Sequence, residues 1–168
     1  ALLAAASGGI WIARHSTCRR TPVAPLQQKV DLDQTVHCIE GIAPPVLADR
    51  GLEAAIEAVA RRSPMDVEVK ASIPRRPPPV VETAAYFIAA EALTNAAKHA
   101  GGAAARVELT ELRGLLVVEV SDAGQGGADA RGTGLTGLRH RVEALDGRLL
   151  VTSPAGVGTT VRAELPCG

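Results

Sequence analysis

The chain has 168 residues, which is enough for one ordinary domain with a sizeable core. Its 18 basic and 18 acidic side chains cancel, so the composition indicates neither a nucleic-acid partner nor attraction to an anionic membrane. One Trp, one Tyr and one Phe leave little aromatic surface for stacking on bases, and the core must be built from aliphatic side chains. We therefore expect one domain with a short additional segment and no nucleic acid as partner.

The cysteines and the N-terminal apolar run exclude two further classes. Cys18, Cys38 and Cys167 are odd in number and lack metal-ligand spacing, so we expect neither a disulfide framework nor a zinc site, and a reducing cytoplasm fits best. The apolar run 1–13 is shorter than the roughly 20 residues that a transmembrane helix needs. A signal peptide is not indicated, because the positive charges follow this run. We expect a cytoplasmic chain without a membrane span.

Prolines divide the first part of the chain. Residues 1–29 show little periodicity and include two prolines within 21–25, which predicts a poorly ordered lead-in. Apolar residues follow a helical period from Val30 to Ile42, so we predict a short helix that Pro44-Pro45 ends. The main domain should then occupy residues 44–168.

Apolar periodicity and turn residues in the main domain predict helices and strands in mixed order. The expected elements are, in chain order, a helix over 52–60, a strand over 67–73, a long helix over 80–100, strands over 105–112 and 115–120, a helix over 135–145, and strands over 148–152 and 159–165. Arg113-Gly114 should form a hairpin turn. Strict alternation of strand and helix is absent, which favours an α+β fold: a two-layer α/β sandwich with helices on one face of a mixed or antiparallel sheet.

The long helix carries a polar stripe in the run EALTNAAKH. Glu91, Asn95, Lys98 and His99 stand at i, i+4, i+7 and i+8, so they share one side of the helix while apolar residues occupy the other. A carboxylate, a carboxamide, an ammonium and an imidazole on one wall can hold a divalent metal and the phosphates that it neutralises. An ordinary solvated helix face is the alternative, and this helix alone slightly favours it; the glycine spacing that follows favours the metal and phosphate site instead.

Two glycine motifs follow the third strand. Asp122, Gly124 and Gly126 form DxGxG, in which the carboxylate can accept a hydrogen bond from an exocyclic amino group and the glycines let the backbone approach a flat ring such as adenine. Taken alone, DxGxG is more often a tight turn than a nucleotide site. Residues Gly132 to Gly137 read GTGLTG and open a helix, where free N–H groups favour phosphate.

Other nucleotide-binding motifs explain these glycines less well. A Rossmann fingerprint requires that the glycines directly follow a strand, which they do not, and the next strand ends in Thr152-Ser153-Pro154 where a ribose-binding acid is needed. No GxxxxGK[ST] sequence exists in the chain, which excludes a P-loop. Gly158-Thr159-Thr160 opens the last strand and could place a hydroxyl at a bound base. The order and spacing of all four motifs are more specific than any one of them.

Together the motifs resemble the ATP-binding domain of sensor histidine kinases, in the superfamily shared with gyrase, the mismatch-repair ATPases and the large heat-shock chaperones. The resemblance covers roughly Pro44 to Pro166. EALTNAAKHA, SDAGQGG and GTGLTGLRHRVEALDGRL look most like the kinase subfamily that feeds LuxR-type response regulators. The resemblance implies a Bergerat-type ATP-binding fold, ATP and Mg²⁺ as cofactors, and transfer of the γ-phosphoryl group to a histidine.

The resemblance also implies a role for each matching residue. Asn95 would ligate Mg²⁺, Glu91 would assist the transfer, and Asp122 would hold the adenine amino group. Lys98 and His99 would face phosphate or ribose. The remaining nucleotide contacts would come from Gly124 and Gly126 at the base, from Gly132, Thr133, Gly134, Leu135 and Gly137 at the phosphates, and from Thr159 at the adenine.

One departure concerns the phosphoacceptor. These kinases carry a two-helix dimerisation hairpin ahead of the domain, with a His followed by an acidic residue, whereas residues 30–43 resemble only the last turns of such a hairpin. His15 precedes Ser and His37 precedes Cys, so neither matches. We therefore expect a histidine-containing phosphoacceptor on a separate protein or domain, as in a split kinase, and a response regulator downstream. Ala128 to Arg131 would be a short ATP lid.

Three other functions share the same ATP pocket and remain open. The chain could be a serine kinase of the anti-sigma type, an ATP hydrolase with Glu91 as the base for water, or a non-catalytic nucleotide-sensing module. The helix that contains RHRVEALDGRL and the very short lid favour the histidine kinase.

Overall fold

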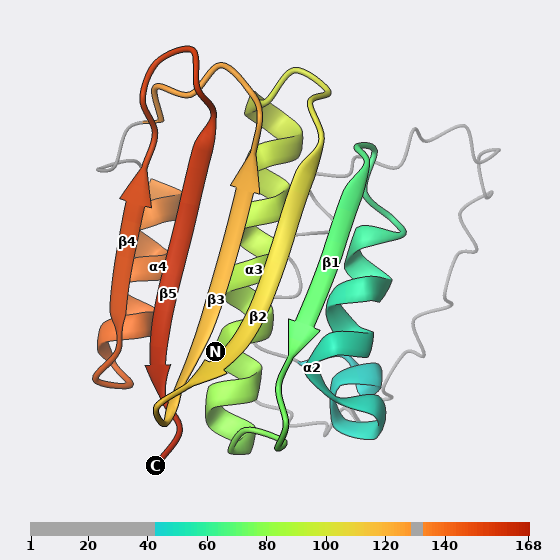
Figure 1. The fold of residues 1–168 in the computed structure, drawn as a ribbon, viewed down its shortest axis with the longest axis vertical. Coiled ribbons are helices and arrows are strands. Elements are labelled where there is room, and N and C mark those ends of the chain that lie inside the picture. Colours follow the sequence, from blue (N-terminus) through green and yellow to red (C-terminus); the bar gives the residue numbers. More distant parts are fainter. Residues whose placement is uncertain (1–42, 129–132) are drawn as a thin grey trace, which may run out of the picture. The chain divides into compact units, whose positions relative to one another are not determined.

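A five-stranded sheet with three helices on one face forms the part of the chain described by the computed structural model, residues 43–128 and 133–168 (Figure 1). The predicted lead-in over 1–29 and the predicted short helix over Val30 to Ile42 lie outside these residues. Of the predicted lid, only Ala128 lies within them. The boundaries that we assigned to the N-terminal segments therefore remain predictions.

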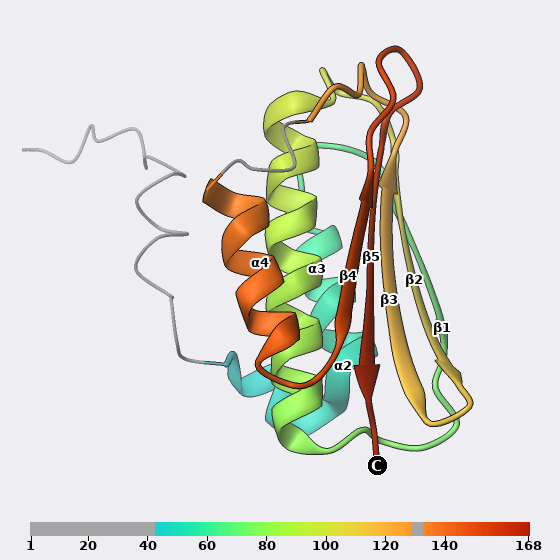
Figure 2. The ribbon, with the colours of Figure 1, turned by 90° about the vertical axis from the view of Figure 1, so that its left-hand side faces the viewer.

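The helices and strands agree with the expected order. Their bounds are α2 Pro45–Ala60, β1 Val67–Ser72, α3 Pro79–His99, β2 Ala105–Leu112, β3 Leu115–Asp122, α4 Thr133–Glu143, β4 Arg148–Thr152 and β5 Thr159–Pro166. The sheet order is β1-β2-β3-β5-β4, with β1 and β2 parallel and every other neighbouring pair antiparallel. Figure 2 shows all three helices on the same side of the sheet. The predicted two-layer α+β sandwich with a mixed sheet is confirmed.

Local sequence explains the β2–β3 hairpin. Leu112 pairs with Leu115, and the two residues between them, Arg113 and Gly114, have φ values of 53° and 77°. Two successive residues with positive φ match the right-handed twist of the strands, which is why such two-residue turns are preferred in hairpins. The predicted turn is therefore confirmed.

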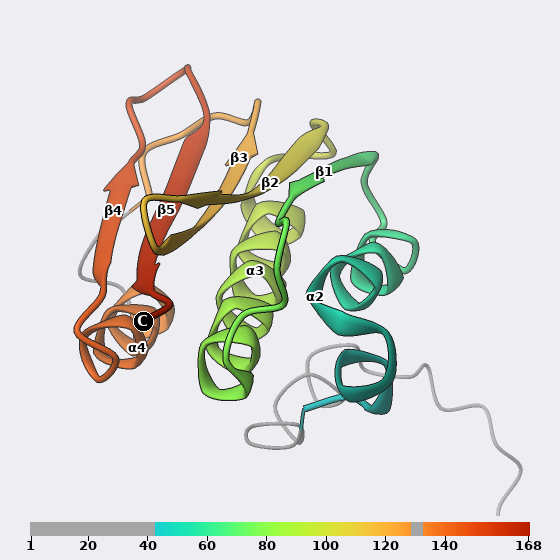
Figure 3. The same ribbon diagram turned by 60° about the horizontal axis from the view of Figure 1, so that its bottom comes forward.

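Helix α3 lies between α2 and α4 beneath the sheet, as Figure 3 shows. Its buried face is rich in alanine, and Ala85, Ile88 and Ala89 are completely buried. Small side chains allow a helix to approach its neighbours closely. The opposing face of the sheet supplies larger aliphatic residues such as Val107, Leu116 and Leu165. The core is aliphatic, as the composition predicts.

The start of α2 corrects one prediction. We expected Pro44-Pro45 to stop an earlier helix and the next helix to begin at Leu52, whereas α2 begins at Pro45. Proline is compatible with the first turn of a helix because the N–H that it lacks has no partner there. The helix is broken at Gly51, whose φ of 82° and ψ of −179° are not helical. The predicted helix over 52–60 corresponds to the segment after this break.

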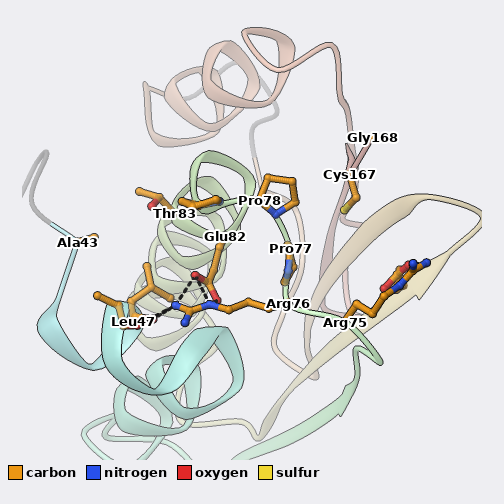
Figure 4. Close-up of a pocket in the computed structure, with 13 residues that line it drawn as sticks. Ala43, Leu47, Arg75, Arg76, Pro77, Pro78, Glu82, Thr83, Cys167 and Gly168 are labelled. Carbon is orange, nitrogen blue, oxygen red and sulfur yellow. Dashed lines mark hydrogen bonds and ion pairs between the residues drawn. The ribbon is translucent and has the colours of Figure 1, made fainter.

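The buried Glu82 carboxylate and the half-exposed Arg76 guanidinium form an ion pair that satisfies backbone groups on both sides of the break (Figure 4). The Glu82 carboxylate is 4% exposed and accepts a hydrogen bond of 3.1 Å from the Leu52 N–H. Arg76 donates from Nε to both oxygens of Glu82, at 3.1 and 3.2 Å, and from Nη2 to the carbonyl oxygens of Leu47 and Ala48, at 2.7 and 2.9 Å. The hydrogen bonds and negative charge of Glu82 raise the pKa of Arg76. One pair therefore caps two helical segments.

We predict that Glu82→Ala lowers the free energy of unfolding by about 1–3 kcal/mol, because the buried Leu52 N–H then has no acceptor. Urea denaturation of the full chain measures the change. Glu53→Ala, which removes an exposed carboxylate from α2 beside Leu52, serves as the matched control and should change stability little. Equal stability of the two variants would contradict the capping role of Glu82.

Candidate functional site

The predicted motifs meet at one end of the fold. The C-terminal end of α3, the end of β3, the loop from β4 to β5 and the beginning of α4 all lie at the top in Figure 1. A cavity of about 780 Å³, which Arg76 and Glu82 help to line, lies near the beginning of α3 at the opposite end. The clustered motifs are therefore separate from this cavity.

The base-binding residues predicted from the sequence lie opposite each other on two paired strands. Strand β3 extends to Asp122, two residues beyond the predicted end, and Asp122 pairs with Thr159 of β5. The Asp122 Oδ1 atom accepts a hydrogen bond of 2.9 Å from the Gly124 N–H. This short-range bond is the Asx type of turn, and it fixes the carboxylate at the end of the strand. A carboxylate can accept at its second oxygen as well, so Asp122 retains capacity for a ligand.

The glycines that follow β3 allow backbone segments to touch. A Cβ atom on Gly124 would lie 2.5 Å from the Ala100 Cα atom at the end of α3. Gly126 has φ 63°, and a Cβ atom there would overlap the carbonyl oxygen of Pro154. We expected these glycines to make room for a flat ring. In the structure they first make room for neighbouring backbone, which brings three loops together.

The loop from β4 to β5 is fastened to the segment after β3 by backbone hydrogen bonds. The Gly127 N–H donates to the carbonyl oxygen of Ser153 at 3.0 Å, and the Gly156 N–H donates to that of Gln125 at 2.6 Å. Gly158 has φ 105°, and a Cβ atom there would overlap the carbonyl oxygen of Asp122. Backbone hydrogen bonds and close backbone contacts thus hold the two loops together at the end of β3.

Ser153 is a residue that sequence reasoning missed. Its Oγ atom lies 2.9 Å from Thr159 Oγ1, and it accepts a hydrogen bond of 2.9 Å from the Ala128 N–H. In the sequence, Ser153 is only the serine of a Thr-Ser-Pro turn, so it had no signal of a site. The structure makes it the direct neighbour of the predicted base-binding threonine.

The polar stripe of α3 meets the first turn of α4. Glu91 and Asn95 are half-buried, whereas Lys98 and His99 are exposed in the last turn of α3. A Cβ atom on Gly134 would lie 3.2 Å from Glu91 Oε1 and 3.5 Å from Asn95 Nδ2. The second glycine of the GTGLTG loop therefore packs directly on the stripe. Sequence spacing alone could not decide whether these two motifs meet.

The chemistry at this contact suits an anion and a hard cation together. The first N–H groups of a helix lack intrahelical partners and attract anions, and the first turn of α4 contains no acidic residue. Glu91 and Asn95 place oxygen atoms beside it, which are the ligand type that Mg²⁺ takes. Within residues 43–128 and 133–168 no group of three or more His, Cys, Asp and Glu side chains could form a metal cage. A Mg²⁺ ion that binds through few protein ligands plus phosphate and water fits this donor set.

Four residues of the predicted phosphate loop are less well supported. Gly132 lies outside the described residues, and Thr133 is the first residue of α4. Leu135 is 8% exposed and belongs to the hydrophobic core, so any phosphate contact would have to come from its backbone. A Cβ atom on Gly137 would meet no atom within 4 Å, so local packing does not require glycine there. Their roles remain predictions.

The described residues contain no helix with the length and apolar character that crossing a bilayer requires.

Residues 80–168 match the family described as histidine kinase-, DNA gyrase B-, and HSP90-like ATPase. This match covers more than half of the chain and includes the motifs gathered at the site.

Two curated relatives are sensor histidine kinases. The chain is 34% identical over 137 residues to sensor histidine kinase MctS of Rhizobium johnstonii, covering 74% of this chain and 30% of the relative. It is 37% identical over 91 residues to oxygen sensor histidine kinase NreB of Staphylococcus carnosus, covering 51% of this chain and 26% of the relative. The chain therefore spans less than a third of the length of either relative.

Solved structures share the fold. The histidine kinase domain of the Erythrobacter litoralis EL346 blue-light activated histidine kinase superposes with a TM-score of 0.57 and 25% identity, covering 67% of this chain and 57% of that chain. The Acinetobacter baumannii histidine kinase AdeS gives a TM-score of 0.56 at 13% identity, covering 73% of each chain, and supports the fold alone. The chain thus belongs to the histidine kinase-, DNA gyrase B- and HSP90-like ATPase family and contains the ATP-binding domain of a histidine kinase.

Proposed function

We propose that this chain binds Mg·ATP and transfers the γ-phosphoryl group to a histidine outside residues 43–168, on a partner protein or on another domain. The contact of Gly134 with Glu91 and Asn95 carries the proposal, because it brings one glycine of the proposed phosphate loop to a carboxylate and a carboxamide suited to catalysis and to a metal. The names of the relatives support histidine as the acceptor.

Asp122 and Thr159 would bind the adenine. The Asp122 carboxylate, held at Oδ1 by the Gly124 N–H, would accept a hydrogen bond from the exocyclic amino group. Thr159 stands opposite Asp122 on the neighbouring strand, which supports a contact of both side chains with the same ring. The glycines around them would let the ring lie close to the backbone.

Asn95 and the beginning of α4 would bind the phosphates and the metal. The Asn95 carboxamide oxygen would ligate Mg²⁺, while the N–H groups of the first turn of α4 would bind phosphate oxygens. Mg²⁺, when bound, would neutralise charge on the phosphates. Lys98 and His99 are exposed at the end of α3 and would face phosphate or ribose. Phosphoryl transfer depends mainly on such positioning and charge stabilisation.

Glu91 would orient the incoming imidazole and hold its proton during transfer. Its half-buried carboxylate lies beside the first turn of α4, where the terminal phosphate would be bound. The phosphoacceptor, the sensed signal and a downstream response regulator would belong to parts of the system beyond this domain. We also propose a cytoplasmic location, which agrees with the lack of disulfide or metal-ligand spacing among the three cysteines of the sequence.

For the base pocket, we predict that Asp122→Asn weakens ATP binding at least about tenfold, because the amide nitrogen cannot accept from the adenine amino group. Asparagine retains an oxygen that can accept from the Gly124 N–H, so the turn should survive. Isothermal titration calorimetry measures the affinity, and Asp49→Ala on the exposed surface of α2 is the control. Unchanged ATP affinity in Asp122→Asn would refute the pocket assignment.

For the metal, we predict that Asn95→Ala weakens Mg·ATP binding while metal-free ADP binding changes less, because the carboxamide oxygen would serve the ion and not the base. Calorimetry with Mg²⁺ and with a chelator separates the two effects. An equal loss in both conditions would contradict the ligand role of Asn95.

For the transfer, we predict that γ-labelled ATP yields acid-labile label on a histidine-containing hairpin protein added to the purified chain. Glu91→Gln should retain ATP binding and lose the transfer. Labelling of the chain alone that His15→Gln or His37→Gln abolishes would place the acceptor within the chain. Acid-stable label on a partner serine would instead indicate a serine kinase of the anti-sigma type.

A further inference from the structure

The Ser153 hydroxyl links two parts of the nucleotide site. It follows β4 directly, is half-buried, and lies 2.9 Å from Thr159 Oγ1 and 2.9 Å from the Ala128 nitrogen. The carbonyl oxygen of the same residue accepts from the Gly127 N–H at 3.0 Å. Because Ser153 is held through both its backbone and its side chain, its Oγ atom has a defined position.

The donor in the Ser153–Thr159 hydrogen bond can be inferred from the neighbouring groups. A serine hydroxyl has one proton to donate and two lone pairs to accept with. The Ala128 N–H occupies one lone pair of Ser153 Oγ. Accepting a hydrogen bond makes a hydroxyl a stronger donor, because hydrogen bonds in a chain polarise one another. This chain of hydrogen bonds favours Ser153 as the donor and Thr159 Oγ1 as the acceptor.

This direction leaves the Thr159 proton available for a ligand. Asp122 lies on the paired strand, and an ionised carboxylate accepts hydrogen bonds but cannot donate them. The two side chains then present one acceptor and one donor to a bound base. Adenine offers the complementary pair, an amino group that donates and a ring nitrogen that accepts, whereas guanine offers the reverse pair at the equivalent positions.

We propose that Ser153 is a positioning residue for base selection: it donates to Thr159 and thereby directs the Thr159 proton toward the adenine ring. The inference rests on the proposed ATP site and assigns the chain a means of rejecting guanine nucleotides. Without the Ser153 hydroxyl, Thr159 can rotate and donate elsewhere, so its preference for an accepting ring atom is lost.

A double-mutant cycle on the full chain tests this role. Ser153→Ala should weaken Mg·ATP binding about three- to tenfold in calorimetry, the range expected for one neutral hydrogen bond. Mg·GTP binding should fall less, so the preference for ATP should decrease. In a Thr159→Val background the same Ser153→Ala change should have no further effect. Ser153→Thr, which retains a hydroxyl, should restore most of the ATP affinity.

The controls separate this role from a purely structural one. Thr152→Ala removes an exposed hydroxyl one residue earlier and should leave both affinities unchanged, and thermal unfolding should confirm that each variant is folded. Additive effects of Ser153→Ala and Thr159→Val, or an equal loss of ATP and GTP affinity, would overturn the inference. Failure of the unmodified chain to bind ATP would refute the proposed function and the inference together, whereas normal ATP binding by Ser153→Ala would refute the inference alone.

Discussion

The close contact of backbone with backbone at the end of β3 is the constraint on which the site depends. Gly124 lies against Ala100, and Gly126 lies against Pro154, at separations that leave no room for a Cβ atom. Gly158 approaches the Asp122 carbonyl oxygen in the same way. A side chain at any of the three glycines would push a loop away and move the Asp122 carboxylate from its place opposite β5.

Helix α3 unites the two halves of the site. Ala100, the residue that caps its C-terminus, lies against the loop after β3, which belongs to the half proposed to bind the base. About one and a half to two and a half turns earlier, Asn95 and Glu91 lie against Gly134, which belongs to the half proposed to bind phosphate. Because both halves rest on one rigid element, the distance between them is fixed by the helix. The alanine-rich buried face of α3 keeps that helix close to the sheet.

The sequence allowed the element order, the mixed two-layer fold and the hairpin turn to be predicted, because periodicity and turn residues are local signals. The role of Ser153 as a site residue could not be predicted, because a lone serine has no characteristic spacing and acquires its partners only when β4 and β5 pair. The beginning of α2 at Pro45 was missed, because proline both ends and begins helices. The Arg76–Glu82 pair joins segments through tertiary contacts that no local pattern encodes. Leu135 fits a phosphate motif by position, yet its side chain belongs to the core.

The break in α2 at Gly51 has a mechanical consequence. A continuous helix would pass a displacement of its beginning along its own axis to its end. Here the carbonyl groups before the break are held by Arg76, and the N–H after it is held by Glu82 in the first turn of α3. A displacement of the segment before Gly51 would therefore pass through Arg76 and Glu82 to α3. The same helix carries Glu91 and Asn95.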